Sequence, residues 1–158
     1  FILVSTSTIP PRTGRVPPMR QATTILRVAT SGRGFTEITR EVARWQRASG
    51  IGEGLLSLLC RHTSASLVIQ ENADDDVKTD LLGFFRRIAP DGMDWIVHRT
   101  EGADDMPAHI KAALTQTSIG IPVVGGELAL GTWQGIYLFE HRARPHRRQV
   151  VLHLIGET

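Results

Sequence analysis

Hydrophobic residues along this chain follow two patterns, which are short apolar runs typical of strands and longer stretches with helical spacing. Strands are predicted for 22–29, 55–61, 65–70, 119–124, 127–130, 133–141 and 148–155, and residues 94–99 are expected to be extended. Helical spacing predicts three helices, over 36–48, after Asn72 or Asp74 as far as Ile88, and over 106–116.

Local signals mark where several of these elements begin or turn. Asn72 or Asp74 is a suitable N-cap for the second helix. Asp105 stands directly before Met106-Pro107, and proline is favoured in a first helical turn. Gly125-Gly126 connects its two strands as a hairpin. Runs of strands with interspersed helices predict an α+β fold, a largely antiparallel sheet with about three helices packed on one face.

Residues 1–18 differ from the rest of the chain. They hold four of its eight prolines, two arginines and no acidic residue. We expect residues 1–18 to form a mobile N-terminal extension and residues 19–158 to form one domain.

Composition narrows the class of protein. Hydrophobic residues make up 41% of the chain, and no apolar run approaches the roughly 18 residues that span a bilayer. The single cysteine, Cys60, excludes an internal disulfide and indicates a reducing, cytoplasmic setting. The chain has 18 basic and 16 acidic residues, and two of the basic ones, Arg12 and Arg15, lie in residues 1–18. Residues 19–158 therefore have 16 of each and no formal net charge. A general nucleic-acid-binding function is therefore not expected, because such proteins usually have a basic face.

The first candidate for chemistry is the polar segment Arg61-His62-Thr63-Ser64-Ala65-Ser66, which lies between two predicted strands. Buried polar groups need partners. The segment is therefore either a turn whose hydroxyls bond backbone groups or part of a site. Ser64 lies two residues from His62, which leaves a nucleophile pair open as an alternative.

The second candidate is the stretch from His98 to Lys111, which holds two histidines and three acidic residues. Neutral imidazole suits zinc and similar ions, and carboxylates add oxygen ligands or orient the histidines. Asp104 and Asp105 are equally explained as favourable charges at a helix N-terminus. Neither dipole nor propensity explains His109 in a first helical turn, so we interpret it as functional.

Two further segments suit structural roles as well as chemistry. Trp133-Gln134 lies between two glycines at a strand start, which is typical of a buried tryptophan anchor. The segment 140–148 joins two strands and is rich in arginine, which suits either a solvated hairpin tip or contacts to phosphate. The glycines at 50–54 lack the lysine-serine ending of a phosphate-binding loop.

These motifs resemble those of the YjbQ family, also called the secondary thiamine-phosphate synthase family, and most closely its proteobacterial branch. The resemblance runs from about Met19 to Glu157. It is carried by Gly32-Arg33-Gly34-Phe35, His62-Thr63-Ser64-Ala65-Ser66, Glu71-Asn72, the segment from Glu101 to Lys111, Gly131-Thr132-Trp133-Gln134-Gly135 and Glu140-His141. Other branches differ at Asp104 and Asp105, and the family often has other residues at His141 and His146, so these four are not assigned to the site.

The resemblance implies an α+β domain that assembles as a homotrimer, with a polar cleft lined by the histidine motifs. It also implies weak thiamine-phosphate synthase activity. This transferase reaction joins a pyrimidine diphosphate to a thiazole phosphate and releases pyrophosphate. The expected partner is a small phosphorylated metabolite, and neither nucleic acid nor membrane is expected to bind.

Residue roles are assigned from the needs of this reaction. A divalent ion, zinc or magnesium, is expected on His62, His98 and His109. Catalytic roles are expected for His62, Glu101, His109 and Lys111, and contacts to substrate or phosphate for Arg61, Ser64, Glu71, Trp133 and Gln134. Two alternatives stay open, a metal-dependent hydrolase of a small phosphorylated metabolite and a non-catalytic protein that binds a small ligand.

Overall fold

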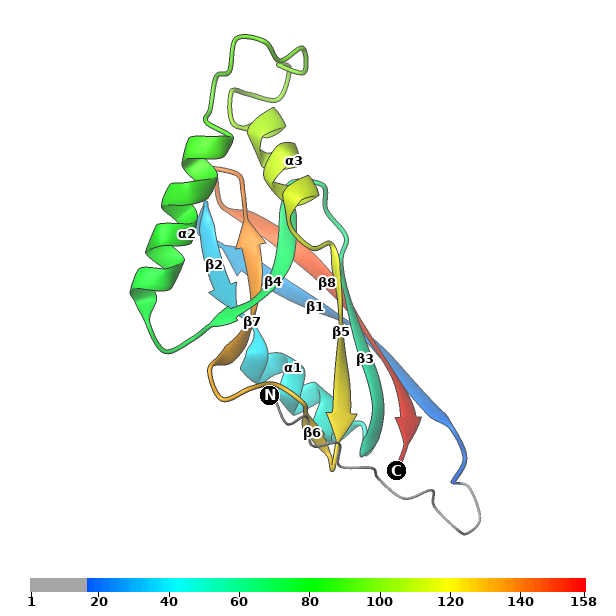
Figure 1. The fold of residues 1–158 in the computed structure, drawn as a ribbon. Helices are drawn as coiled ribbons and strands as arrows, with labels where there is room; N and C mark the ends of the chain where they lie inside the picture. The colour runs from blue at the N-terminus through cyan, green and yellow to red at the C-terminus, as the bar shows by residue number, and fades with distance from the viewer. Residues whose placement is uncertain (1–16) are drawn as a thin grey trace, which may run out of the picture.

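The structure is a computed structural model that describes residues 17–158 (Figure 1). The helices are α1 (Thr39–Ala48), α2 (Asp75–Ile88) and α3 (Asp105–Leu114). The strands are β1 (Arg20–Thr30), β2 (Gly34–Glu37), β3 (Glu53–Cys60), β4 (Ala65–Glu71), β5 (Ser118–Val124), β6 (Glu127–Leu128), β7 (Gln134–Glu140) and β8 (His146–Glu157). The extension expected over residues 1–18 lies outside the described part of the chain as far as residue 16.

The strands form two sheets, and every strand pair in residues 17–158 is antiparallel. The larger sheet has the order β1-β8-β3-β5-β6, and the smaller one has the order β2-β7-β4. The predicted α+β class, with three helices and antiparallel pairing, is therefore confirmed. The strands divide between two sheets, however, where one was expected.

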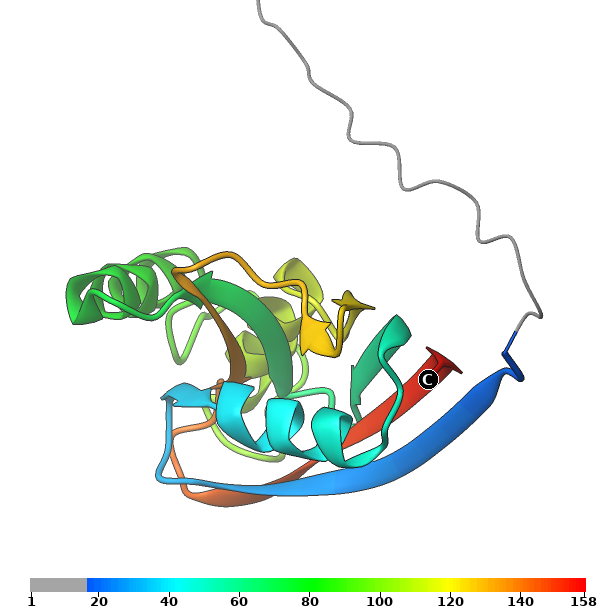
Figure 2. The same cartoon turned by 90° about the horizontal axis from the view of Figure 1, so that it is seen from below.

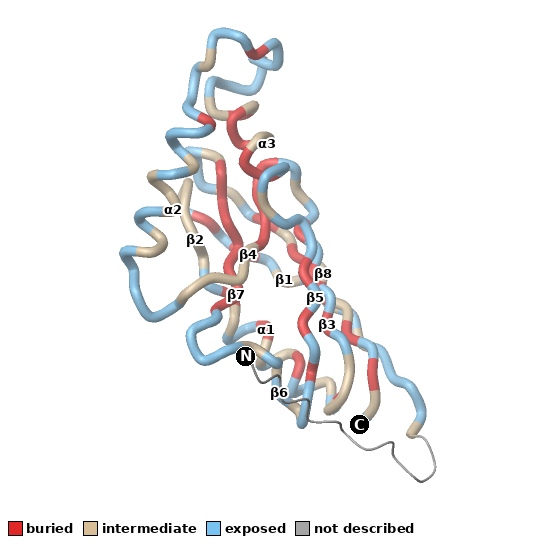
Figure 3. The backbone as a smooth tube through the Cα atoms, in the orientation of Figure 1, coloured by how far each residue is buried: buried red, intermediate tan, exposed pale blue. Residues whose placement is uncertain are grey.

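The hydrophobic core brings the two sheets together. Alternate residues of β3 and β8, such as Leu56 and Leu152, cluster with Leu67 of β4 and Leu138 of β7, and each is at most 1% exposed. Helix α1 adds Val42 to the same cluster, and Figure 2 shows this helix on the inner side of the long β1–β8 ribbon. Buried backbone runs through β3, β4, β7 and β8 in Figure 3, whereas α2 is mostly exposed.

Helices α2 and α3 lie on the other side of the small sheet. Phe85 of α2 contacts Phe139 of β7 edge to face at 5.2 Å between ring centroids, and Phe139 stacks on Phe35 of β2 at 4.1 Å. Helix α3 packs against β4 through the buried Ala108 and Ala112. Both faces of β7 are thus covered, and the three helices do not share one face as the sequence had suggested.

Local signals predicted most element boundaries, and long-range pairing explains the exceptions. Asp74 caps α2 by accepting a hydrogen bond from the backbone N–H of Asp76 at 2.9 Å. Gly125-Gly126 joins β5 and β6 as predicted, with φ values of 58° and 82°. Residues 34–37 form a strand before α1, because they pair with β7 far along the chain.

The segment 89–104 between α2 and α3 contains no strand, although residues 94–99 were expected to be extended. Arg99 instead donates hydrogen bonds to the backbone carbonyls of Asp94 and Ile96. None of the helices in residues 17–158 is long and apolar enough to cross a membrane.

Candidate functional site

Three side chains from two segments converge beside the N-terminal turn of α3. The ring nitrogens of His98 and His109 and a carboxylate oxygen of Asp105 all lie within 4.8 Å of one another. Nε2 of His98 is 2.7 Å from Oδ2 of Asp105, and Nε2 of His109 is 3.4 Å from the same oxygen. Asp105 is 2% exposed, whereas the two rings are partly open to solvent.

The helix and the loop before it position these three groups. Asp105 and His109 are four residues apart, so they share one face of α3. Nδ1 of His109 lies 3.0 Å from the carbonyl oxygen of Thr63. A carbonyl only accepts, so Nδ1 carries the proton and the lone pair of Nε2 faces Asp105. Two acceptors that face each other at this distance require a cation or a proton between them.

Arg142, in the loop between β7 and β8, holds the acidic side of the group. Its Nη1 donates to Oδ1 of Asp105, and its Nε donates to Oδ2 of Asp104 at 3.2 Å. Burial alone would raise the pKa of Asp104, but hydrogen bonds from the Ala143 N–H and from Arg142 outweigh it and lower that pKa. Oδ2 of Asp105 is thereby left for the histidines.

This arrangement can hold a metal ion. It offers two imidazole nitrogens and one carboxylate oxygen, and its other carboxylate oxygen and His109 Nδ1 are fixed by outer partners, as ligand groups usually are. Three protein ligands leave at least one coordination position for water or substrate, which is typical of catalytic rather than structural zinc.

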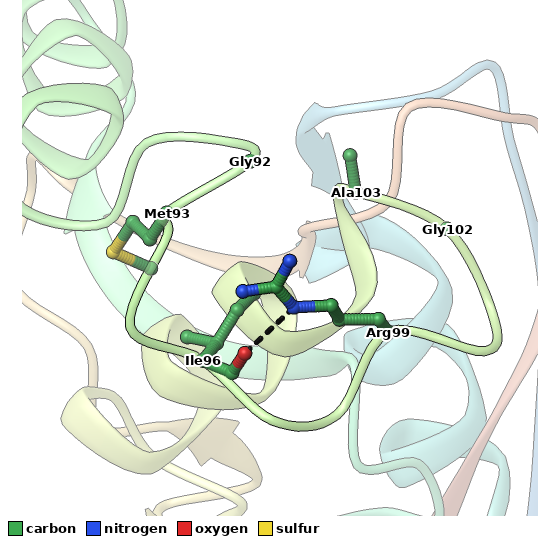
Figure 4. A pocket seen from close by; sticks show the side chains of 6 residues that line it. All are labelled: Gly92, Met93, Ile96, Arg99, Gly102 and Ala103. Atoms are coloured by element: carbon green, nitrogen blue, oxygen red, sulfur yellow. Dashed lines mark hydrogen bonds between the residues drawn. The ribbon is translucent and has the colours of Figure 1, made fainter.

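The loop 89–104 beside this group encloses a cavity of its own. Figure 4 shows its six lining residues, all from that loop, around a cavity of about 200 Å³. The Arg99 side chain reaches across it, and its Nε donates to the Ile96 carbonyl at 2.8 Å. His98, Asp105 and His109 do not line this cavity, so it is separate from the metal-binding geometry.

The sequence matches a known family model over residues 24–157, described as UPF0047 protein YjbQ-like. The chain belongs to this family. It is 51% identical to a UPF0047 protein of Synechocystis over 88% of this chain and 95% of the relative. Identity to the YjbQ protein of Escherichia coli O157:H7 is 44%, over 84% and 96%. The expected likeness to proteobacterial members is therefore present, although the cyanobacterial relative is more similar.

A crystal structure from the YjbQ/UPF0047 family supports the fold. The protein from Clostridium acetobutylicum superposes with a TM-score of 0.77 at 36% identity, covering 83% of this chain and 98% of that one.

Two of the three histidines proposed from the YjbQ resemblance meet, and His62 is not in their group. Nε2 of His62 accepts a hydrogen bond from the Gln149 N–H at 2.8 Å. Burial, followed by repulsion from Arg148, lowers the pKa of His62, in keeping with a neutral acceptor. His62 therefore holds the loop before β4 against β8, and Asp105 is the third member of the group that could hold a metal ion.

The other catalytic and phosphate candidates near α3 are dispersed. Glu101 is exposed, with its carboxylate 3.9 Å from Arg142. Ser64 accepts a hydrogen bond from Arg148 at 3.1 Å, within a buried network. Arg61 is exposed beside Gln149. Lys111 is 4% exposed and lies on a different side of α3 from His109.

Glu71, Trp133 and Gln134 lie at the far end of the small sheet. Glu71 pairs with Gln134 at one end of the β4–β7 ladder, whereas Ala65 pairs with Glu140 at the end near α3. Six residues of strand separate these ends, which is about 20 Å. Trp133 is 63% exposed, so it is not the buried anchor that its glycine neighbours suggested. Within one chain these three residues do not reach the histidine group.

Sequence reasoning named Asp105 and His141 but left them out of the site, and it missed Arg142. The first had a usable signal, since a carboxylate four residues before a histidine on a helix shares its face. Arg142 and His141 had none, because they meet α3 and β4 only through the pairing of β7 in the tertiary fold.

Proposed function

We propose that this protein is a metal-dependent enzyme that acts on a small phosphorylated metabolite at His98, Asp105 and His109. One observation carries the proposal. Two imidazole nitrogens approach the same Asp105 oxygen, at 2.7 and 3.4 Å. Arg142 donates to the other oxygen of that carboxylate, and the Thr63 carbonyl accepts from Nδ1 of His109.

The donor set favours zinc or a similar ion over magnesium. Zinc and its neighbours accept imidazole readily, whereas magnesium prefers an octahedral shell of oxygens. When bound, such an ion polarises a phosphoryl oxygen or lowers the pKa of a coordinated water.

The residues of the chain then have distinct tasks. Arg142 fixes the Asp105 carboxylate through one of its oxygens, and the Thr63 carbonyl sets the orientation of the His109 ring. Glu101 is exposed, with its carboxylate 3.9 Å from Arg142, and we assign it the role of accepting a proton or orienting substrate. His62 supports the β3–β4 loop that carries Thr63.

The specific reaction that we propose is the slow formation of thiamine phosphate, which the family resemblance implies. In it, the bond from the pyrimidine methylene carbon to the diphosphate oxygen breaks, the thiazole nitrogen bonds to that carbon, and pyrophosphate leaves. We further propose that this takes place in the cytoplasm. Hydrolysis of a phosphate ester is the second candidate, because three protein ligands leave room for an attacking water.

The test begins with metal content. Metal-stripped wild-type protein should regain close to one zinc per chain, measured by elemental analysis after dialysis. His109→Ala should lower zinc affinity by at least about 100-fold, since even outer-shell changes cost 10–100-fold. His153→Ala is the matched control and should retain zinc, because this histidine of β8 lies outside the ligand group. Equal zinc content in wild type and His109→Ala would contradict the site.

Activity is then measured with the same proteins. Zinc-loaded wild type should form thiamine phosphate and pyrophosphate from the two substrates, and His109→Ala should form neither. Release of inorganic phosphate from a panel of phosphate esters without thiamine phosphate would instead select the hydrolase. A zinc-loaded protein that turns over neither set would reject an enzymatic role on these substrates.

A further inference from the structure

A second group of polar side chains lines a cavity between α2, α3 and β7, on a different side of α3 from the histidines. The cavity measures about 50 Å³, and its polar lining comes from Arg33, Arg86, Lys111, Glu140 and His141. Lys111 is two positions after His109 on α3, so the two side chains point in directions about 200° apart around the helix axis. The cavity is therefore distinct from the metal-binding group.

Lys111 is the first unusual feature of this cavity. Its side chain is almost fully enclosed, with 4% exposure, and it forms no hydrogen bond or ion pair with any residue of the described part. Burying an ammonium group without a partner is strongly unfavourable. The fold therefore tolerates a cost at this position that an anion in the cavity would offset.

His141 presents a second polar atom without a partner. Its Nε2 lies 2.8 Å from the Ser66 hydroxyl oxygen, which lies 2.6 Å from the Thr115 hydroxyl. Nδ1 is buried and has no hydrogen-bond partner in residues 17–158.

No acidic group that lines the cavity is free to pair with Lys111. The Glu140 carboxylate accepts from Arg148 at 2.5 and 2.7 Å, so its charge is already matched. Arg33 is held by Asp91 at 2.6 Å and by the His141 carbonyl at 3.1 Å. Arg86 is exposed on α2 and, in the described chain, forms no hydrogen bond or ion pair. The cavity thus has a nearly enclosed cation and an unpartnered ring nitrogen within it, and one free cation at its edge.

We infer that this cavity is a binding site for a tetrahedral oxyanion, a single phosphate group. Lys111 binds its oxygens, the unpartnered Nδ1 of His141 forms a further hydrogen bond with the phosphate group, and Arg86 covers it from the solvent side. A single water needs roughly 10–15 Å³ of such space, so about 50 Å³ suits one phosphate group. The inference does not depend on the metal site.

The experiment titrates inorganic phosphate into the full chain by calorimetry, with a chelator present so that no metal contributes. Wild type should bind phosphate, and Lys111→Met should weaken binding by about 10–100-fold, as expected for the loss of a charged hydrogen bond. Arg86→Met should weaken it a few-fold, because its charge is exposed. Arg87→Met is the matched control, one residue along α2 and outside the cavity lining, and should bind as wild type does.

A stability measurement separates a binding role for Lys111 from a structural one. Without phosphate, Lys111→Met should melt at a higher temperature than wild type, because it removes an unpaired buried charge while keeping the apolar stem. Phosphate should raise the melting temperature of wild type but not that of the variant. No binding by wild type at millimolar phosphate, or equal binding by Lys111→Met, would overturn the inference.

The same titration distinguishes the source of the phosphate group. Binding of both inorganic phosphate and a small phosphate monoester would assign the site to a substrate phosphate. Binding of inorganic phosphate alone would assign it to the free ion. Because the chelator is present throughout, and because His109→Ala should bind phosphate normally, failure of this site is distinguishable from failure of the proposed metal centre.

Discussion

Some buried side chains of this protein have a pKa that differs from that of the same group in the unfolded chain. The largest shift is that of His141. It is 1% exposed, and burial, followed by the charge of Lys111, lowers its pKa to about 3. Its partner Ser66 is also fully buried. Neutral His141 is thus part of the folded state, and adding a proton there opposes folding.

The sign of this effect gives a pH prediction. Above about pH 6.5 the ring is neutral in both states, whereas between 6.5 and 3 only the unfolded chain takes up the proton. Stability should therefore fall with decreasing pH, and His141 should contribute about 1.4 kcal/mol per pH unit. His141→Gln should have a shallower loss between pH 7 and pH 5 in urea unfolding. The contribution of His62, whose pKa is also lowered, is the same in both proteins, so equal slopes would contradict the assignment.

At the scale of elements, the loop between β7 and β8 is fastened to the start of α3. Arg142 binds Asp104 and Asp105 through its guanidinium and donates to the Glu101 carbonyl at 2.8 Å. The Ala143 N–H adds a bond to Asp104 at 2.8 Å. The helix that carries two of the proposed metal ligands is therefore oriented by a loop that carries none.

Arg142→Met should affect both stability and metal binding. It leaves the buried Asp105 carboxylate without its cation, which should cost about 1–3 kcal/mol of unfolding free energy. It should also lower zinc affinity by about 10–100-fold, the usual effect of removing an outer-shell partner. Added zinc should restore part of the melting temperature, because the ion supplies positive charge to Asp105. Arg144→Met, in the same loop but exposed, is the control and should match wild type in both measurements.

At the scale of the whole molecule, the outer face of the large sheet carries several exposed apolar residues. Leu55 and Leu59 of β3 are each 46% exposed, and Ile155 and Ile25 are 40% and 38% exposed. The strand register places Leu55 beside Ile155, and Leu59 and Ile25 on either side of Val151. The polar row Ser57–His153–Thr23 lies between these apolar groups. Exposed apolar residues gathered on one face are typical of an interface.

We propose that this face is where the homotrimer implied by the family resemblance assembles. Light scattering should give three times the 17.4 kDa chain mass. Leu55→Lys places a charge in the centre of the face and should yield monomers or much weaker association. Ile88→Lys introduces the same charge at an exposed apolar residue of α2 and should remain trimeric. A monomeric wild type at micromolar concentration would reject the trimer, and dissociation by Ile88→Lys alone would place the contact elsewhere.

Local sequence determined most of the elements and one part of the candidate site. Periodicity located three helices and most strands, Asp74 marked the start of α2, and Gly125-Gly126 marked a hairpin. These features depend on residues a few positions apart, so the sequence displays them directly. The same is true of His109, whose position in α3 was unexplained by helix propensity.

The tertiary structure alone decided which residues meet. The division into two sheets depends on the pairing of β7 with β2 and β4, and the same pairing brings Arg142 to α3 and His141 to Ser66. It also separates Trp133 and Gln134 from the histidines. Contacts of this kind join residues far apart in the chain, and the free energy that selects them comes from burial of the shared core. No local pattern records that choice.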